Sequence, residues 1–253
     1  IPFLKLTNMI KDIQLSNKNF SYKLRSTAFG LIFPITKFGS FEIGYYQDNN
    51  YYKQEEELDY SRDLNYLNIS LDIDQLDHLL FPKEGTKFIL SYHSSEKSII
   101  KNALTNENSY LNNYTYLNTK IEHFKTIYYK HTLRFFYWYK NSNDETPIHL
   151  QANYSSYNWA IGFNEYDLFS KNINSGGFEY QYHYKNSTTF RFLINKIFKI
   201  DQLDNGPLTY GIGLRIKSII GPLNFIWSKG YTEPLNQKSK KQDIIYFNFG
   251  VKL

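Results

Sequence analysis

The chain has 253 residues, of which 42% are hydrophobic and 19% aromatic, with no cysteine and a formal net charge of +5. No run of roughly 18 apolar residues occurs, which excludes a transmembrane helix, and no basic segment followed by an apolar stretch opens the chain as a signal peptide would, so we expect a mature, processed or partial chain. The 24 tyrosines and 20 phenylalanines favour a β-barrel in a membrane, because such a barrel places aromatic side chains outward. The mean hydropathy of −0.52 is compatible with a barrel, since only alternate residues of each strand contact lipid.

Side chains alternate between apolar and polar along most of the chain, which predicts β-strands. Residues 1–17 are weakly patterned and are either half a strand or a connector. The alternating runs are about 9–12 residues long, the length that a tilted strand needs to cross a bilayer. Eleven strands are expected after residue 17, and a closed barrel normally has an even number, so either residues 1–14 supply a twelfth strand or further strands precede the chain. The clearest runs are 41–46, 66–73, 87–92, 133–140, 178–185, 208–217 and 245–253.

The connections between these runs alternate in length. If the last strand ends in the periplasm, the long connections fall outside and the short ones inside, as in outer-membrane barrels. Segment 141–176 is ambiguous, because Ile148, Leu150, Ala152 and Tyr154 alternate with polar residues and could form a further strand. We favour a long structured loop folded into the barrel lumen. The expected outer connections are 95–111, 141–176, 200–206 and 230–241; the expected periplasmic ones are 75–84, 185–187 and 219–222.

Several short motifs between residues 80 and 253 resemble the BamA/TamA-type barrel superfamily, also called bacterial surface antigen domains. They are a Phe-Pro turn at 80–86, the loop and strand segments 159–163 and 175–180, a strand, Gly-Pro turn and strand at 211–223, and an alternating terminal strand at 245–253. The resemblance implies an all-β fold: a transmembrane antiparallel β-barrel with about 12 strands in this chain, either complete or as part of a 16-stranded barrel, with a long sixth-loop-like segment in the lumen.

The same resemblance implies roles for individual residues. Phe247, Phe249, Gly250 and Leu253 would form the assembly signal of the closing strand, and Gly162, Phe163, Gly176 and Gly177 would belong to the lumen loop. The insertases and transporters of this superfamily carry a Val-Arg-Gly-aromatic signature whose arginine contacts the barrel wall, and no Arg-Gly pair occurs here. The loop is more similar to that of patatin-like phospholipase (type Vd) autotransporters, in which the barrel anchors an N-terminal lipase.

The chain lacks recognisable catalytic motifs. Neither the Gly-x-Ser-x-Gly elbow nor the Asp-Gly-Gly or Asp-Gly-Ala motif of a patatin lipase is present, and the six histidines have no metal-ligand spacing. We therefore expect no enzyme, no cofactor and no metal in this chain. The alternation predicts that the strand charges face the barrel lumen: Lys23, Arg25, Arg134, Glu179, Arg191, Arg215 and Lys217.

Residues 1–253 are thus expected to form one outer-membrane barrel domain, the C-terminal part of a longer protein, that anchors or translocates a passenger domain. Alternatives are a BamA/TamA-like assembly or secretion barrel, a diffusion porin and, from a soluble class, an aromatic-rich carbohydrate-binding β-domain. The expected partners are the lipid bilayer, lipopolysaccharide, the outer-membrane assembly machinery, and a passenger domain or a second copy of the chain. The expected location is the bacterial outer membrane.

Overall fold

The computed structural model of the protein consists of strands and their connections. It describes residues 1–15, 18–54, 57–78, 81–95, 98–102, 108–111, 114–143, 152–153, 161–163, 169–185, 187–201, 203–204, 206–218, 221–231 and 241–249. These residues are in strands, turns and bends, with no helix among them. It follows that none of them belongs to a helix long and apolar enough to cross a membrane.

Seventeen strands are distributed along the described residues. They are β1 Pro2–Leu15, β2 Lys18–Thr36, β3 Gly39–Gln54, β4 Glu57–Asp74, β5 Gly85–Ser95, β6 Ser98–Asn102, β7 Asn108–Leu111, β8 Tyr114–Tyr128, β9 His131–Ser142, β10 Ala152–Asn153, β11 Phe169–Ser170, β12 Ile173–Lys185, β13 Thr188–Ile200, β14 Leu203–Asp204, β15 Leu208–Ser218, β16 Gly221–Tyr231 and β17 Lys241–Phe249.

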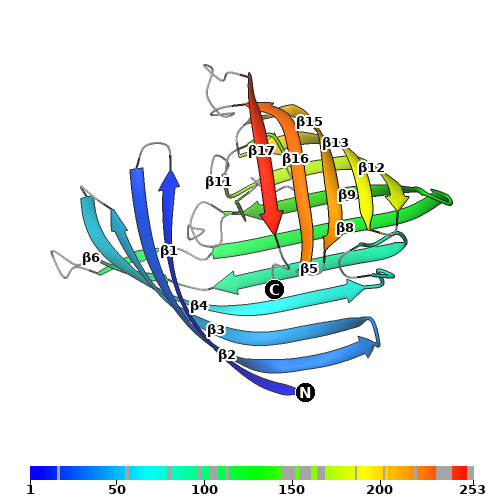
Figure 1. Ribbon diagram of the computed structural model, residues 1–253. Helices are drawn as coiled ribbons and strands as arrows, with labels where there is room; N and C mark the ends of the chain where they lie inside the picture. The colour runs from blue at the N-terminus through cyan, green and yellow to red at the C-terminus, as the bar shows by residue number, and fades with distance from the viewer. Residues whose placement is uncertain are drawn as a thin grey trace. The chain divides into compact units, whose positions relative to one another are not determined.

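Twelve of these strands form one path of hydrogen-bonded neighbours, in the order β1-β2-β3-β4-β5-β8-β9-β12-β13-β15-β16-β17 (Figure 1). The strand pairs whose registers are described, from β1·β2 to β16·β17, are antiparallel. This confirms the all-β antiparallel class and the expectation of about twelve strands. β1 and β17 are the two ends of the order, so closure into a barrel, and membership of a larger one, stay predictions.

The weakly patterned start of the chain is a complete strand. β1 pairs with β2 over its full length, from Pro2 opposite Leu31 to Leu15 opposite Lys18. The sequence left this segment open between half a strand and a connector, because its apolar residues do not alternate regularly. Backbone pairing with β2 satisfies its hydrogen-bonding groups whatever its side chains are.

The chain divides into two compact units. The first unit comprises residues 1–72, 89–118 and 141–151, and the second comprises 73–88, 119–140 and 152–253. The boundary runs through strands rather than between them, since β4, β5, β8 and β9 each contribute to both. That the whole chain is a single barrel domain stays a prediction.

In the first unit, β2 has one face of exposed apolar side chains. Phe29, Leu31 and Phe33 are exposed, whereas Leu24 and Ala28 of the opposite parity are buried. Lys23 and Arg25 have the parity of Phe29, and Lys23 lies opposite the exposed Tyr51 of β3. The prediction that these two charges face inward is therefore wrong. It assumed that a basic residue in a strand marks the polar face. Both residues lie toward one end of β2, where long cationic side chains can reach water.

The buried face of the first unit carries aromatic side chains. Leu64, Tyr66 and Tyr114 form a cluster against which Tyr46 packs. The rings of Tyr46 and Tyr66 are stacked, with centroids 5.2 Å apart. Aromatic side chains therefore also lie on the buried face of the sheet. Whether a tyrosine is exposed depends on its odd or even position along the strand and not on its residue type.

The second unit shows the alternation most clearly in β13. Phe190, Phe192 and Ile194 are 42%, 51% and 51% exposed, while Arg191, Leu193 and Asn195, which alternate with them, are 1%, 2% and 1% exposed. A soluble sheet would bury the phenylalanines and expose the arginine, because removing apolar surface from water is favourable. A face of exposed aromatics opposite a face of buried polar groups is what lipid on one side requires.

Two of the expected outer connections contain additional structure. β6 and β7 form a hairpin within 95–111, and β6 also pairs with β4. β9 and β12, the strands on either side of segment 141–176, pair directly and antiparallel. The short strands β10 and β11, which pair with each other, lie between them in sequence. No further strand stands between β9 and β12 in the sheet, which agrees with a loop and not with an additional crossing.

Candidate functional site

The polar face of the second unit gathers charged side chains from β9, β12 and β13. Strand register places Glu179 of β12 directly opposite Arg134 of β9. On the other side, Gln181 lies opposite Arg191 of β13, so Arg191 and Glu179 are diagonal neighbours on the same face. Pairs at these spacings are within reach of long side chains.

Glu179 is held by both arginines. Arg134 Nη1 donates to Glu179 Oε2 at 3.0 Å, and Arg191 Nε and Nη2 donate to Oε1 and Oε2 at 2.5 and 2.9 Å. Arg134 also contacts Glu122 of β8, with Nη2 2.9 Å from Oε2. Gln181 Nε2 donates to Glu179 Oε1 at 2.9 Å. The two carboxylates and two guanidiniums therefore form one continuous network.

Because the network is buried, removing one of its ions has a large free-energy cost. Glu179, Arg191 and Arg134 are 0%, 1% and 3% exposed. A buried ion whose partner is lost costs roughly 3–5 kcal/mol, and the bidentate geometry of Arg191 on Glu179 is the strongest form of such a pair. The guanidinium of Arg134 also lies 4.4 Å from the centroid of the Phe136 ring. The network thus fixes the relative positions of β8, β9, β12 and β13.

A second feature of the same unit is a loop segment, Ile161 to Phe163, attached to the sheet by one hydroxyl group. Tyr246 of β17 accepts hydrogen bonds from Gly162 N at 2.9 Å and Phe163 N at 3.0 Å, and its hydroxyl donates to Phe163 O at 2.7 Å. One side chain of the last strand thereby satisfies three backbone groups of a segment about eighty residues away in sequence. We call residues 161–163 the docked segment.

Two glycines allow the docked segment to contact the sheet through backbone alone. Gly162 has a φ of +92°, a conformation that favours glycine, and a Cβ there would lie 2.8 Å from Gly230 Cα of β16. A Cβ on Gly230 would lie 1.6 Å from Gly162 O. Any side chain at either position would therefore push the docked segment away from the sheet.

Apolar contacts complete the seat of the docked segment. Ile161 packs in a cluster with Leu193 of β13 and Ile226 of β16, against which Tyr246 also packs. Ile161 and Phe163 are 2% and 0% exposed. The seat therefore lies on the buried face of the sheet, the face that would line a closed barrel.

The docked segment contains two of the residues expected in the lumen loop, Gly162 and Phe163. The other two, Gly176 and Gly177, lie within β12, opposite Tyr137 and Phe136 of β9. Their assignment to the loop is corrected by this position. A Cβ on Gly177 would lie 2.2 Å from Cζ of Phe136, so the glycine makes room for a ring of the neighbouring strand and does not form a turn.

The remaining predicted site residues are dispersed. Arg215 of β15 is half-buried and its Nε donates to Asn224 Oδ1 at 2.8 Å, while Lys217 is exposed near the end of that strand. Phe247 and Phe249 are exposed on β17, opposite Phe225 and Leu223 of β16. Gly250 and Leu253 of the expected assembly signal lie outside the described residues.

Sequence reasoning missed the residues that receive the docked segment, namely Tyr246 and Gly230. The signal for Tyr246 was available, because it is an aromatic residue at a polar-face position of a strand whose other aromatics, Phe247 and Phe249, alternate outward. The role of Gly230 could not be read from the sequence, since it depends on a backbone contact with a distant segment.

Within the described part of the chain, no group of three or more histidine, cysteine, aspartate or glutamate residues is arranged to hold a metal ion. The ion network around Glu179 and the Tyr246 hydroxyl are the two polar features that lie on the buried face beside the docked segment and its strands. Protein atoms bond both of them, although Nη1 of Arg191 is buried without a hydrogen-bond partner among the described residues.

Comparison with known proteins supports the fold. No protein-family model matches the chain, and no curated protein matches it in sequence. BamA from Haemophilus ducreyi lacking POTRA domains 1–3 superposes with a TM-score of 0.68 at 12% identity, covering 95% of this chain and 58% of that one. This chain thus spans less than two thirds of that protein, and the likeness shows the fold of the antiparallel sheet alone.

Two autotransporter domains are more distant. The translocator domain of NalP from Neisseria meningitidis has a TM-score of 0.40 at 12% identity, over 96% of this chain and 84% of that one. The β domain of the Bordetella autotransporter BrkA has a TM-score of 0.34 at 7% identity, over 95% and 94%. Scores this low carry no argument about function.

Proposed function

We propose that this chain is a non-catalytic outer-membrane barrel that anchors or translocates a passenger domain, with the docked segment lying across the lumen. The docked segment carries the proposal: Ile161 to Phe163 are seated on the buried face of β13, β16 and β17 by Tyr246 and the glycine pair. A pore for free diffusion needs an open lumen, whereas a segment fixed to the wall obstructs it. This favours a gated or plugged barrel over a porin.

The passenger is proposed to be a patatin-like lipase joined before Ile1. Support comes from the similarity of segments 159–163 and 175–180 to the loop of those autotransporters and from the missing Arg-Gly pair. Lipase chemistry would then reside outside these 253 residues.

The proposal is tested by protease digestion of intact cells that express the full-length protein with an epitope tag before the passenger. The expected result is loss of the tag and survival of a heat-modifiable barrel fragment, because closed barrels resist both protease and detergent. The purified barrel should also give low, fluctuating conductance in planar bilayers. A protected tag together with a large steady conductance would refute the proposal and support a porin.

An assembly or secretion barrel is the second candidate, favoured by the BamA-type fold. The two candidates differ in what depletion of the protein does. Loss of an assembly barrel lowers the surface levels of many unrelated outer-membrane proteins, whereas loss of a passenger anchor removes one surface activity and leaves the others unchanged.

A further inference from the structure

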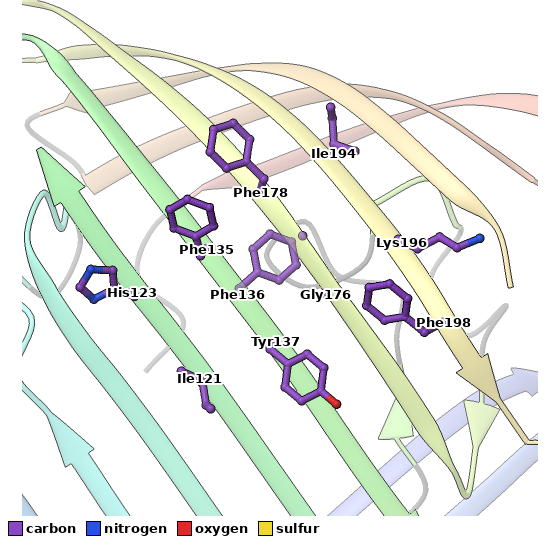
Figure 2. Close-up of a pocket in the computed structure, with 11 residues that line it drawn as sticks. Ile121, His123, Phe135, Phe136, Tyr137, Gly176, Phe178, Ile194, Lys196 and Phe198 are labelled. Atoms are coloured by element: carbon purple, nitrogen blue, oxygen red, sulfur yellow. The ribbon is translucent and has the colours of Figure 1, made fainter. Parts of the chain in front are cut away.

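The exposed apolar face of the second unit contains a groove of about 460 Å³ across β8, β9, β12 and β13. That volume is within the range of roughly 300–1,000 Å³ typical of small-molecule sites. The rings of Phe135, Tyr137, Phe178 and Phe198 surround Gly176 (Figure 2). The groove lies on the face opposite the ion network and the docked segment, so it belongs to neither.

Gly176 creates the groove. In strand register it stands between Tyr137 of β9 and Lys196 of β13, so the outward position between two large side chains has no side chain of its own. A Cβ added there would lie 3.3 Å from Cε2 of Phe198. Glycine weakens a strand interior and can mark a site where a ligand approaches closely. Gly176 is itself buried beside the rings of Tyr137 and Phe198, and it lines the groove.

One end of the groove is basic. Lys196 lines it, and Nζ of Lys196 donates to Gly206 O at 2.7 Å, so the charge lies at the end of β13 near the 200–206 connection. Figure 2 shows the ammonium directed away from the rings. The register shift between Asn174 and Ser175 of β12 makes a bulge in the pairing with β13, and both Phe198 and Lys199 are exposed there. A second lysine is thereby brought to the same end.

We propose that this groove binds an acyl chain of lipid A, with the phosphorylated headgroup of that lipid contacted by Lys196 and Lys199. An apolar channel that ends in two cations complements a lipid whose apolar chains end in an anionic headgroup. The proposal rests on the membrane orientation of the proposed function, which puts the 200–206 connection, and thus both lysines, at the outer leaflet. Lipopolysaccharide is the phosphorylated lipid of that leaflet.

The test measures lipid retention by native mass spectrometry of the full-length protein after exchange from detergent containing hexa-acyl lipid A. Parallel samples contain dephosphorylated lipid A or phosphatidylglycerol. Three variants are compared with wild type: Gly176→Leu, which fills the groove; Lys196→Gln with Lys199→Gln; and Lys185→Gln, which removes a charge from the opposite end of β12. Heat-modifiable migration verifies that each variant is folded.

Gly176→Leu should lower retention of both forms of lipid A at least about 10-fold. The lysine double variant should lower affinity for phosphorylated lipid A about 30-fold, at about 1 kcal/mol for each lysine near a membrane surface, and leave the dephosphorylated form unchanged. Lys185→Gln should match wild type. If Gly176→Leu does not fold, the lysine double variant alone decides the outcome.

Equal retention in every variant would mean non-specific annular lipid and would overturn the proposal. Retention of phosphatidylglycerol as tight as that of lipid A, lost in the same variants, would overturn the choice of lipid A. Neither outcome depends on passenger export, which the protease experiment measures separately. Loss of export with variant-dependent lipid A binding would refute the proposed function and leave the lipid site standing.

Discussion

Replacing Tyr246 by phenylalanine removes one oxygen atom and with it the three hydrogen bonds that hold the docked segment. The ring remains, so the apolar contact with Ile161, Leu193 and Ile226 is kept. A buried neutral hydrogen bond contributes about 1 kcal/mol net, so three contribute about 3 kcal/mol. The undocked population should therefore rise about 150-fold.

Hydrogen exchange followed by mass spectrometry measures this directly, because the amides of Gly162 and Phe163 exchange only when the segment leaves the sheet. Their protection should fall by about two orders of magnitude in Tyr246→Phe, while amides in the centre of β13 keep theirs. Tyr210→Phe is the matched control, since Tyr210 is 51% exposed on the apolar face. Unchanged protection at Gly162 and Phe163 would show that the backbone contact with Gly230 holds the segment alone and that the hydroxyl is dispensable.

Three further predictions concern the strands. Glu179→Gln should destabilise the barrel by about 3–5 kcal/mol, because Arg134 and Arg191 lose their shared counter-ion, and a urea unfolding midpoint equal to wild type would contradict this. Phe249→Asp should block membrane assembly, because it places a charge on the exposed apolar row of the last strand. Deletion of Leu253 should do the same, because the sequence that resembles an assembly signal then loses its terminal apolar residue. Normal surface levels of both variants would argue against that role. Arg215→Leu should assemble normally on heat-modifiable gels, because Arg215 is half-buried on the polar face and its Nε donates to the neutral side chain of Asn224; a folding defect would show that its surroundings need the charge.

The period of two was sufficient to predict the strands and, in most of them, the exposed face. In β13 and β17 the exposure of the side chains alternates with a period of two over most of each strand. β1 and β2 show where the rule is weak. β1 is specified by its backbone pairing with β2, and the cations Lys23 and Arg25 share the parity of Phe29, so residue type alone misplaced them.

The alternation with a period of two could not predict the contacts within the candidate site. It placed Arg134, Arg191 and Glu179 on one face, but their mutual contact depends on register between β9, β12 and β13, which a single sequence does not give. The docked segment requires a contact between Gly162 and Gly230, two residues whose only shared property is the absence of a side chain. Local patterns carry no information about which distant backbone they meet.

Charge balance explains how a loop without arginine can still dock. The resemblance to BamA-type barrels leads one to expect a loop arginine on the barrel wall, but here Arg134 and Arg191 come from the wall itself and are matched by Glu122 and Glu179. The docked segment instead meets the sheet through a neutral hydroxyl, backbone and apolar groups. Its docking should therefore be insensitive to salt, because screening weakens only interactions between charges. Protection of the Gly162 and Phe163 amides should be the same at about 0.01 M and about 1 M monovalent salt, and a loss of protection at the higher concentration would mean that a charged group outside the described residues holds the segment.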